Sequence, residues 1–268
     1  YQLPLTLGRG GAAAGAPPES LLVRLTAPDG EVGVLYAALW DPEFGRELLD
    51  AIARRRRYRG EVGEIVARSA PAFRRAGGAA ASEFEPTISR GGSNNSTLCY
   101  GDRFVLKLFR KIEPGVNPEL EIGRFLTDRK FPNAPSIAGS LEYRAKGESI
   151  TAGVLQVAVP HQGNAAEFTR DHLSAYYEAA LTLRRRDAHV PEPDPPSLST
   201  IEQDPPPLAR DLIGTYLEAA RLMGRRTAEL HLLLAEPTDD PRFTAEPFTD
   251  FYRQGLYHGF VGQLSASI

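Results

Sequence analysis

Residues 93–126 read SNNSTLCYGDRFVLKLFRKIEPGVNPELEIGRFL, and the rest of the chain is organised around this stretch. It opens within a loop, Arg90–Thr97, whose small and polar residues tolerate positive φ. Successive backbone N–H groups in such a loop can converge on an oxyanion. A plain surface hairpin turn has the same composition, so composition alone leaves both interpretations open.

The segment after the Gly101-Asp102 turn predicts a strand, 103–109, that is buried on both faces. A period of two divides its side chains into one face with Val105, Lys107 and Phe109 and another with Phe104, Leu106 and Leu108. An ammonium between Val and Phe needs an anionic partner, because burying it unpaired is costly. The alternative is an edge lysine whose ammonium reaches water.

A helix that begins near residue 117 can supply the anion. Asn117 is a good N-cap and Pro118 suits the first helical position. Glu119 and Glu121 fall in the first turn, where both also favour the positive end of the helix dipole. Helical spacing places apolar residues beside either carboxylate, so spacing does not decide which of them faces the sheet.

The order of elements predicts an α+β protein with three parts. We expect an α/β cap at 1–80, a lobe with an antiparallel sheet and one helix at 81–160, and a helical region at 161–268. The lobe's strands are expected near residues 83–88, 97–100, 103–109, 141–145 and 151–159. Short strands interrupted by one helix argue against a Rossmann unit, in which strands and helices alternate regularly.

The flanking regions carry simpler signals. Strands at 21–25 and 32–36 surround an Asp29-Gly30 turn, and Asp41 is expected to cap a helix that ends in the arginine run 54–57. We interpret that run as a solvated helix end favoured by the dipole. In the C-terminal part we expect helices from 167, over 208–234 and from 248, with a proline-rich loop at 187–207.

The loop, strand and helix closely resemble the maltokinases, from Ser93 to Thr97 and from Tyr100 to Thr127. The resemblance continues through the segments Tyr1–Leu5, Ala38–Phe44, Leu155–Gly163 and Arg226–His231. Maltokinases are ATP-dependent enzymes that make maltose 1-phosphate and are often fused to trehalose synthase. The resemblance therefore implies a cap, a kinase-like N-lobe and the start of a helical C-lobe, with ATP, Mg²⁺ and maltose as ligands.

The resemblance also implies roles for individual residues. Lys107 would pair with the α- and β-phosphates, as the strand-three lysine of protein kinases does, and Glu121 would hold it. Val105 would pack on the adenine. The remaining implied nucleotide contacts are Ser93, Asn94, Asn95, Ser96 and Thr97 over the phosphates, and Gln156, Val157 and Val159 through backbone hydrogen bonds to the base.

Charge and composition limit the other classes of function. The net charge is −3 and the pI about 6.0, which does not favour nucleic acid or an anionic membrane as a partner. A single cysteine, Cys99, excludes an intrachain disulfide and fits a reducing cytosol. No apolar run approaches the length of a membrane span. We therefore expect a cytoplasmic protein.

The catalytic groups of such a kinase are not recognisable in the sequence. Phosphoryl transfer to a sugar needs an aspartate to accept the hydroxyl proton, together with Mg²⁺ ligands. The family carries them on a His-Gly-Asp loop and an Asp-Phe-Glu-like segment, whereas here His258-Gly259 is followed by Phe260. Both ends fall inside regular patterns, so we expect a fragment that is inactive alone, with no metal site and with these groups after Ile268.

Two other functions stay open at this point. The first is a non-catalytic nucleotide- or sugar-binding module fused to trehalose synthase. The second is a kinase for another small hydroxylated substrate.

Overall fold

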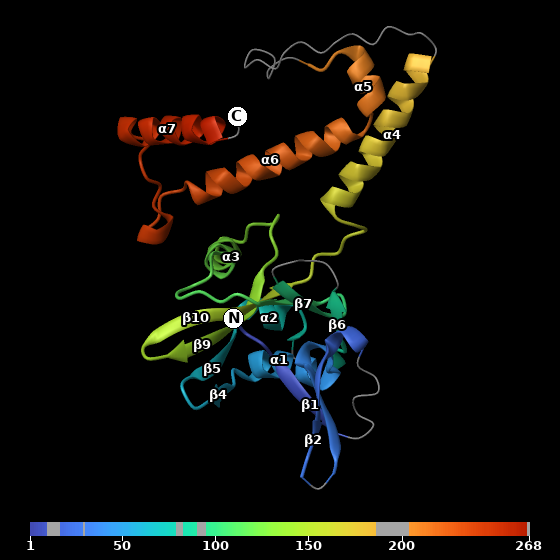
Figure 1. Cartoon of the computed structure of the whole chain (residues 1–268). Coiled ribbons are helices and arrows are strands. Elements are labelled where there is room, and N and C mark those ends of the chain that lie inside the picture. Colours follow the sequence, from blue (N-terminus) through green and yellow to red (C-terminus); the bar gives the residue numbers. More distant parts are fainter. Residues whose placement is uncertain (10–16, 29, 79–82, 90–94, 186–203, 267–268) are drawn as a thin grey trace. The chain divides into compact units, whose positions relative to one another are not determined.

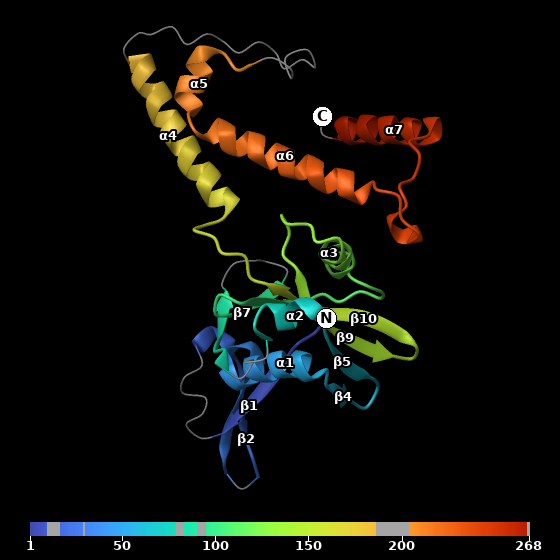
Figure 2. The same cartoon turned by 180° about the vertical axis from the view of Figure 1, so that it is seen from behind.

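The computed structural model describes residues 1–9, 17–28, 30–78, 83–89, 95–185 and 204–266. They form two compact units, Tyr1–Gln162 and Gly163–Ile268, which are treated separately. The first unit combines antiparallel sheets with helices and the second is helical, as Figures 1 and 2 show from opposite sides. The α+β class with antiparallel sheets expected from the sequence is confirmed.

A small antiparallel sheet lies at the N-terminus. Its strands are β1 (Leu5–Arg9), β2 (Leu21–Thr26) and β3 (Val32–Ala37), in the order β1-β3-β2. Gly30 has φ +87° in the β2–β3 connection, a conformation that glycine adopts without a Cβ penalty. Just before this sheet, Gln2 Nε2 donates to Phe109 O at 2.6 Å and to Ala152 O at 2.8 Å, which ties the N-terminus to the second sheet.

The second sheet has seven antiparallel strands in the order β4-β5-β9-β10-β8-β7-β6. Their bounds are Arg57–Arg59 (β4), Glu64–Ser69 (β5), Pro86–Ser89 (β6), Asn95–Tyr100 (β7), Phe104–Phe109 (β8), Ile137–Ala145 (β9) and Glu148–Val157 (β10). Strands β6 to β10 correspond to the five predicted from the sequence, whereas β4 and β5 were not predicted.

The boundary expected between residues 80 and 81 needs correction. Strand β5 pairs with β9 from Glu64↔Arg144 to Ser69↔Gly139, so residues before 80 complete the lobe's own sheet. The arginine run likewise leads from the helix end into β4. Because the hydrogen-bonded ladder crosses the expected boundary, the first compact unit extends without division to Gln162.

Helices cover both faces of the seven-stranded sheet. On one face lie α1 (Pro42–Arg54) and α2 (Pro71–Arg75), and their core includes Leu49, Ile52, Phe104, Leu106 and Leu108. On the other lies α3 (Pro118–Asp128), above a smaller cluster of Phe109, Leu120, Ile137 and Val154 (Figure 1). The predicted division of the β8 side chains between the two faces is therefore correct.

The second unit contains α4 (Ala165–Arg185), α5 (Pro207–Ile213), α6 (Tyr216–Leu234) and α7 (Asp250–Ala266). The single helix predicted over 208–234 is wrong, because Gly214 at φ 60° and ψ −138° separates α5 from α6. Most of the predicted proline-rich loop lies outside the described residues. Within the described part of the chain, no helix has the length and apolar character needed to cross a membrane.

Candidate functional site

The sheet face beside α3 carries most of the residues singled out in the sequence. Strand register aligns Thr97 with Lys107 and Val154, and Cys99 with Val105 and Gln156. Residues directly opposite one another in antiparallel strands share a face. Apart from the buried Val154, these side chains are partly exposed, whereas Leu98, Leu106 and Leu155 on the other face are buried. Helix α3 therefore leaves part of this face open.

Lys107 places its ammonium on the open part of this face beside α3, and the ammonium is paired. Lys107 Nζ donates to Glu119 Oε1, with the lysine side chain 33% and the glutamate side chain 29% exposed. Gln156 Nε2 donates to the same oxygen at 3.0 Å. The shared carboxylate fixes the ammonium between β8, β10 and α3 through charge-assisted hydrogen bonds. Lys107 is therefore not an edge lysine that simply extends into water.

The partner of Lys107 in the structure is Glu119, which corrects the preference for Glu121 taken from the family resemblance. The start of α3 is anchored on β10, because the Asn117 amide donates to Thr151 Oγ1 at 2.9 Å. Leu120 is fully buried against the sheet. At about 100° per residue, Glu119 and Glu121 leave the helix on opposite flanks of Leu120. The anchor and the packing of Leu120 turn the Glu119 flank toward Lys107.

The residues expected to cover the phosphates are only partly described. Ser93 and Asn94 lie outside the described residues. Asn95, Ser96 and Thr97 do not belong to a loop, because they pair in β7 with Phe109, Leu108 and Lys107. All three also line a cavity of about 340 Å³ that is bordered by Trp40 and Arg110. The loop expected over Arg90–Thr97 therefore ends earlier than the composition predicted.

The backbone of residues 156–159, expected to bind the base, is largely engaged in hydrogen bonds within the protein. The backbone of Gln156 lies within the ladders to β8 and β9, so its contribution to the site is its side chain. The Val157 amide donates to Ser136 O at 2.9 Å and is therefore not available to a ligand. Val159 is 54% exposed and, among the described residues, forms no backbone hydrogen bond. Of the backbone donors expected here, the Val159 amide is the one left to meet a ligand.

This face also carries a thiol, that of Cys99 on β7. Burial raises the pKa of the Cys99 thiol, which keeps it protonated and poorly nucleophilic. In the described part of the chain, no cluster of three or more His, Cys, Asp or Glu residues is placed to hold a metal ion. The described side chains thus provide a positioned ammonium and an open surface, and no ligand set for Mg²⁺.

The side chain of Gln156 was missed in the sequence analysis. Its position on the same strand face as Val154 was available from the period of two. Its contact with Glu119 depends on the placement of α3, which no local pattern gives.

Comparison with known proteins adds a distant similarity. No protein-family model matches the chain. One solved structure that resembles it is described as a glucosamine kinase in complex with glucosamine, ADP and inorganic phosphate. The match has a TM-score of 0.35 and 15% sequence identity, and covers 69% of this chain and 43% of the other. This chain therefore corresponds to less than half the length of that protein.

Proposed function

We propose that this chain is the nucleotide-binding part of a kinase that transfers the γ-phosphoryl group of ATP to a sugar. The observation that supports this most strongly is the ammonium of Lys107, held by Glu119 on a sheet face that α3 leaves open. Such a kinase stabilises its transition state mainly by positioning the phosphates and neutralising their charge. A fixed cation beside an open surface would supply positive charge at a defined position for the phosphates.

The roles of the chain's residues follow from their positions. The Lys107 ammonium would pair with the phosphates, and Glu119 with Gln156 would hold it in place when no nucleotide is bound. Val105 and Cys99 offer an apolar surface in the neighbouring row, suited to the adenine. The carbonyl of Val157 and the amide of Val159 are suited to the polar edge of the base. A bound Mg²⁺ would screen the β- and γ-phosphates, and we assign no residue to it.

The acceptor that we propose is maltose, which would give maltose 1-phosphate. This choice, like a fused or associated trehalose synthase, depends on the maltokinase resemblance alone. The cytoplasmic location that we propose is instead favoured by the single cysteine. A second candidate is a non-catalytic nucleotide-binding module. The lack of a His-Gly-Asp sequence within these 268 residues is compatible with this candidate as well as with a kinase whose base lies elsewhere.

The nucleotide site is tested by titrating this chain with a fluorescent ADP analogue. Lys107→Met should weaken binding about tenfold or more, because a charged hydrogen-bond donor to the phosphates is lost. The matched control is Lys111→Met, which removes the same charge from an exposed lysine that pairs with Glu113 at the surface. Equal affinities in the two variants would contradict the proposal.

The identity of the sugar that accepts the phosphoryl group is tested by a second measurement. Release of ADP from ATP is followed with the full-length protein that contains this chain, with maltose, glucosamine or no sugar. Turnover that requires maltose supports the maltose kinase. Nucleotide binding with no sugar-dependent turnover supports the non-catalytic module instead.

A further inference from the structure

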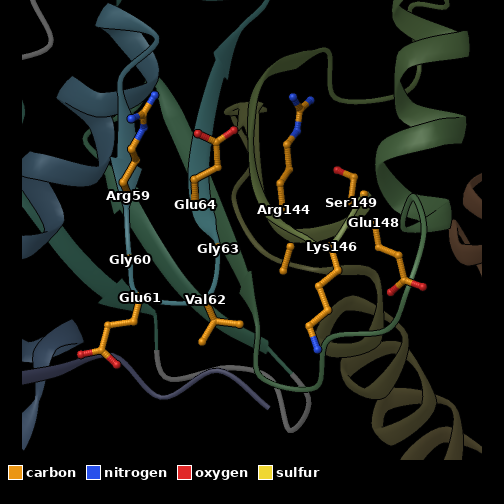
Figure 3. A pocket seen from close by; sticks show the side chains of 12 residues that line it. Arg59, Gly60, Glu61, Val62, Gly63, Glu64, Arg144, Lys146, Glu148 and Ser149 are labelled. Carbon is orange, nitrogen blue, oxygen red and sulfur yellow. The ribbon is translucent and has the colours of Figure 1, made fainter.

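A second charged area lies on the same sheet face, on the β4–β5–β9 side. Register places Arg59, Glu64 and Arg144 side by side on β4, β5 and β9. Figure 3 shows these three side chains extending in the same direction from neighbouring strands. The next residues on this face are Arg57, opposite Val66, and Arg68, opposite Ser140. Arginine therefore dominates this end of the sheet.

One buried carboxylate is shared by three of the guanidinium groups. Glu142 is 7% exposed, and its oxygens lie 2.8 Å from Arg68 Nε, 2.9 Å from Arg144 Nη2 and 3.6 Å from Arg124 Nη2. Arg124 also donates to the hydroxyl of the buried Ser140 at 3.0 Å. Three positive charges against one negative charge leave an excess of two. The cluster fixes the arginine side chains without neutralising them.

Two of these arginines, Arg68 and Arg124, border a cavity of about 380 Å³. Arg55, Arg57, Arg68 and Arg124 contribute to its wall, and none of its other lining residues is acidic. We call these four residues the arginine groove. Among the described residues, the carboxylates in contact with them are Glu142 and, 3.9 Å from Arg57, Glu64. The groove therefore keeps a net positive charge even when both are counted.

The backbone at Arg55 adds an independent observation. Arg55 follows α1 in the left-handed conformation, at φ 56° and ψ 45°, where glycine is normally found. The Cβ of a non-glycine residue is strained in this region, and such residues concentrate at ligand clamps. Here the conformation places a guanidinium in the wall of the cavity, where a glycine would leave none.

We propose that the arginine groove binds a small molecule that carries a phosphate or diphosphate group. One guanidinium group can donate two parallel hydrogen bonds to the oxygens of a phosphate. Several guanidinium groups around one cavity therefore suit a ligand with at least two negative charges. The cavity volume suits a phosphorylated sugar or a diphosphate, and the protein's net charge of −3 does not favour a long polyanion. Neither Lys107 nor its partners Glu119 and Gln156 line the groove, so the groove and the proposed nucleotide site are formed by different residues.

The test is calorimetric titration of this chain with inorganic pyrophosphate, without metal and at low salt. Arg55→Gly and Arg57→Gln are the informative variants, since the first removes a guanidinium and relieves the backbone at the same position. Each should weaken binding about tenfold or more. Arg54→Gln is the matched control, because Arg54 neighbours the groove but pairs with Asp50 outside it. Melting temperatures establish that all variants are folded.

Lys107→Met separates this site from the proposed nucleotide site. Binding that survives Lys107→Met but is lost in Arg55→Gly and Arg57→Gln supports the groove, whatever the outcome for nucleotide. Glucose 6-phosphate then distinguishes a phosphorylated sugar from free diphosphate as the preferred ligand. Binding that is equal in Arg55→Gly, Arg57→Gln and Arg54→Gln would overturn the proposal, as would binding of a long polyphosphate only.

Discussion

Gln156 Nε2 lies 3.0 Å from Glu119 Oε1, which joins β10 to α3 at the oxygen that also accepts from Lys107. The sheet and the helix thus share one carboxylate. Because the helix start is also bonded to Thr151 of β10, the position of the cation depends on contacts at both ends of this strand.

Removing the charge of Glu119 should weaken nucleotide binding. In Glu119→Gln the ammonium of Lys107 loses its counter-charge and its fixed position, so we expect the affinity for ADP to fall about tenfold. Glu121→Gln should have the smaller effect, because Glu121 leaves α3 on the opposite flank. Titration with a fluorescent ADP analogue measures both, and the reverse order would restore Glu121 as the lysine's partner.

The stability of the protein should depend on pH through Glu142. Burial raises the pKa of this carboxyl, but hydrogen bonds and charges from Arg68 and Arg144 outweigh it, so the pKa lies below its usual value near 4.5. A lowered folded-state pKa contributes stability above the unfolded pKa, and that contribution is lost as pH falls through the folded pKa.

Glu142→Gln should accordingly destabilise the protein at neutral pH. The difference in unfolding free energy between wild type and variant should shrink as the pH falls below the usual carboxyl pKa near 4.5 and through the lowered pKa of the folded state. Urea unfolding at each pH measures this difference. A difference that stays constant over the range would mean that the ionised carboxylate contributes nothing.

Replacing Gly139 or Gly224 by alanine should change the stability of the protein in opposite directions. A Cβ on Gly139 would lie 2.5 Å from Arg68 O, in a ladder whose backbone cannot move apart, so Gly139→Ala should cost about 1–3 kcal/mol. A Cβ on Gly224 of α6 meets nothing within 4 Å, and Gly224→Ala should stabilise that helix by about 1 kcal/mol. Thermal melting followed by circular dichroism tests both. Equal shifts would contradict the close packing of β5 on β9.

The fully buried Tyr100 should contribute stability through its hydroxyl. It donates to Gly45 O of α1 at 2.7 Å, and burial raises the pKa of the phenol. Tyr100→Phe keeps the ring packing and removes this bond, so we expect a loss of about 1 kcal/mol in chemical unfolding. The control is Tyr58→Phe, whose hydroxyl bonds Glu47 at the surface and should matter less. A larger loss at Tyr58 would be inconsistent with the buried bond.

Local patterns were sufficient for several parts of the site. Alternation in 103–109 placed Lys107 on the correct face of β8, and Asn117 with Pro118 located the start of α3. These features depend on residues that are close in sequence. Local patterns did not predict β4 and β5. Strand β4 has only three residues, Arg-Tyr-Arg, and in β5 the apolar residues Ile65, Val66 and Ala67 are consecutive, so neither shows the apolar alternation that marks a half-buried strand.

The sequence by itself determined the inward lysine, the two candidate carboxylates and the approximate positions of the central strands along the chain, because each follows from a short-range period, a turn or a capping residue. The tertiary structure decided that Glu119 meets Lys107 and that the arginines gather around Glu142. The rotation of α3 is set by its anchor on Thr151 and by the burial of Leu120, and β5 lies beside β9 across more than 60 residues of chain. Contacts of that range depend on how whole elements pack, which no local spacing encodes.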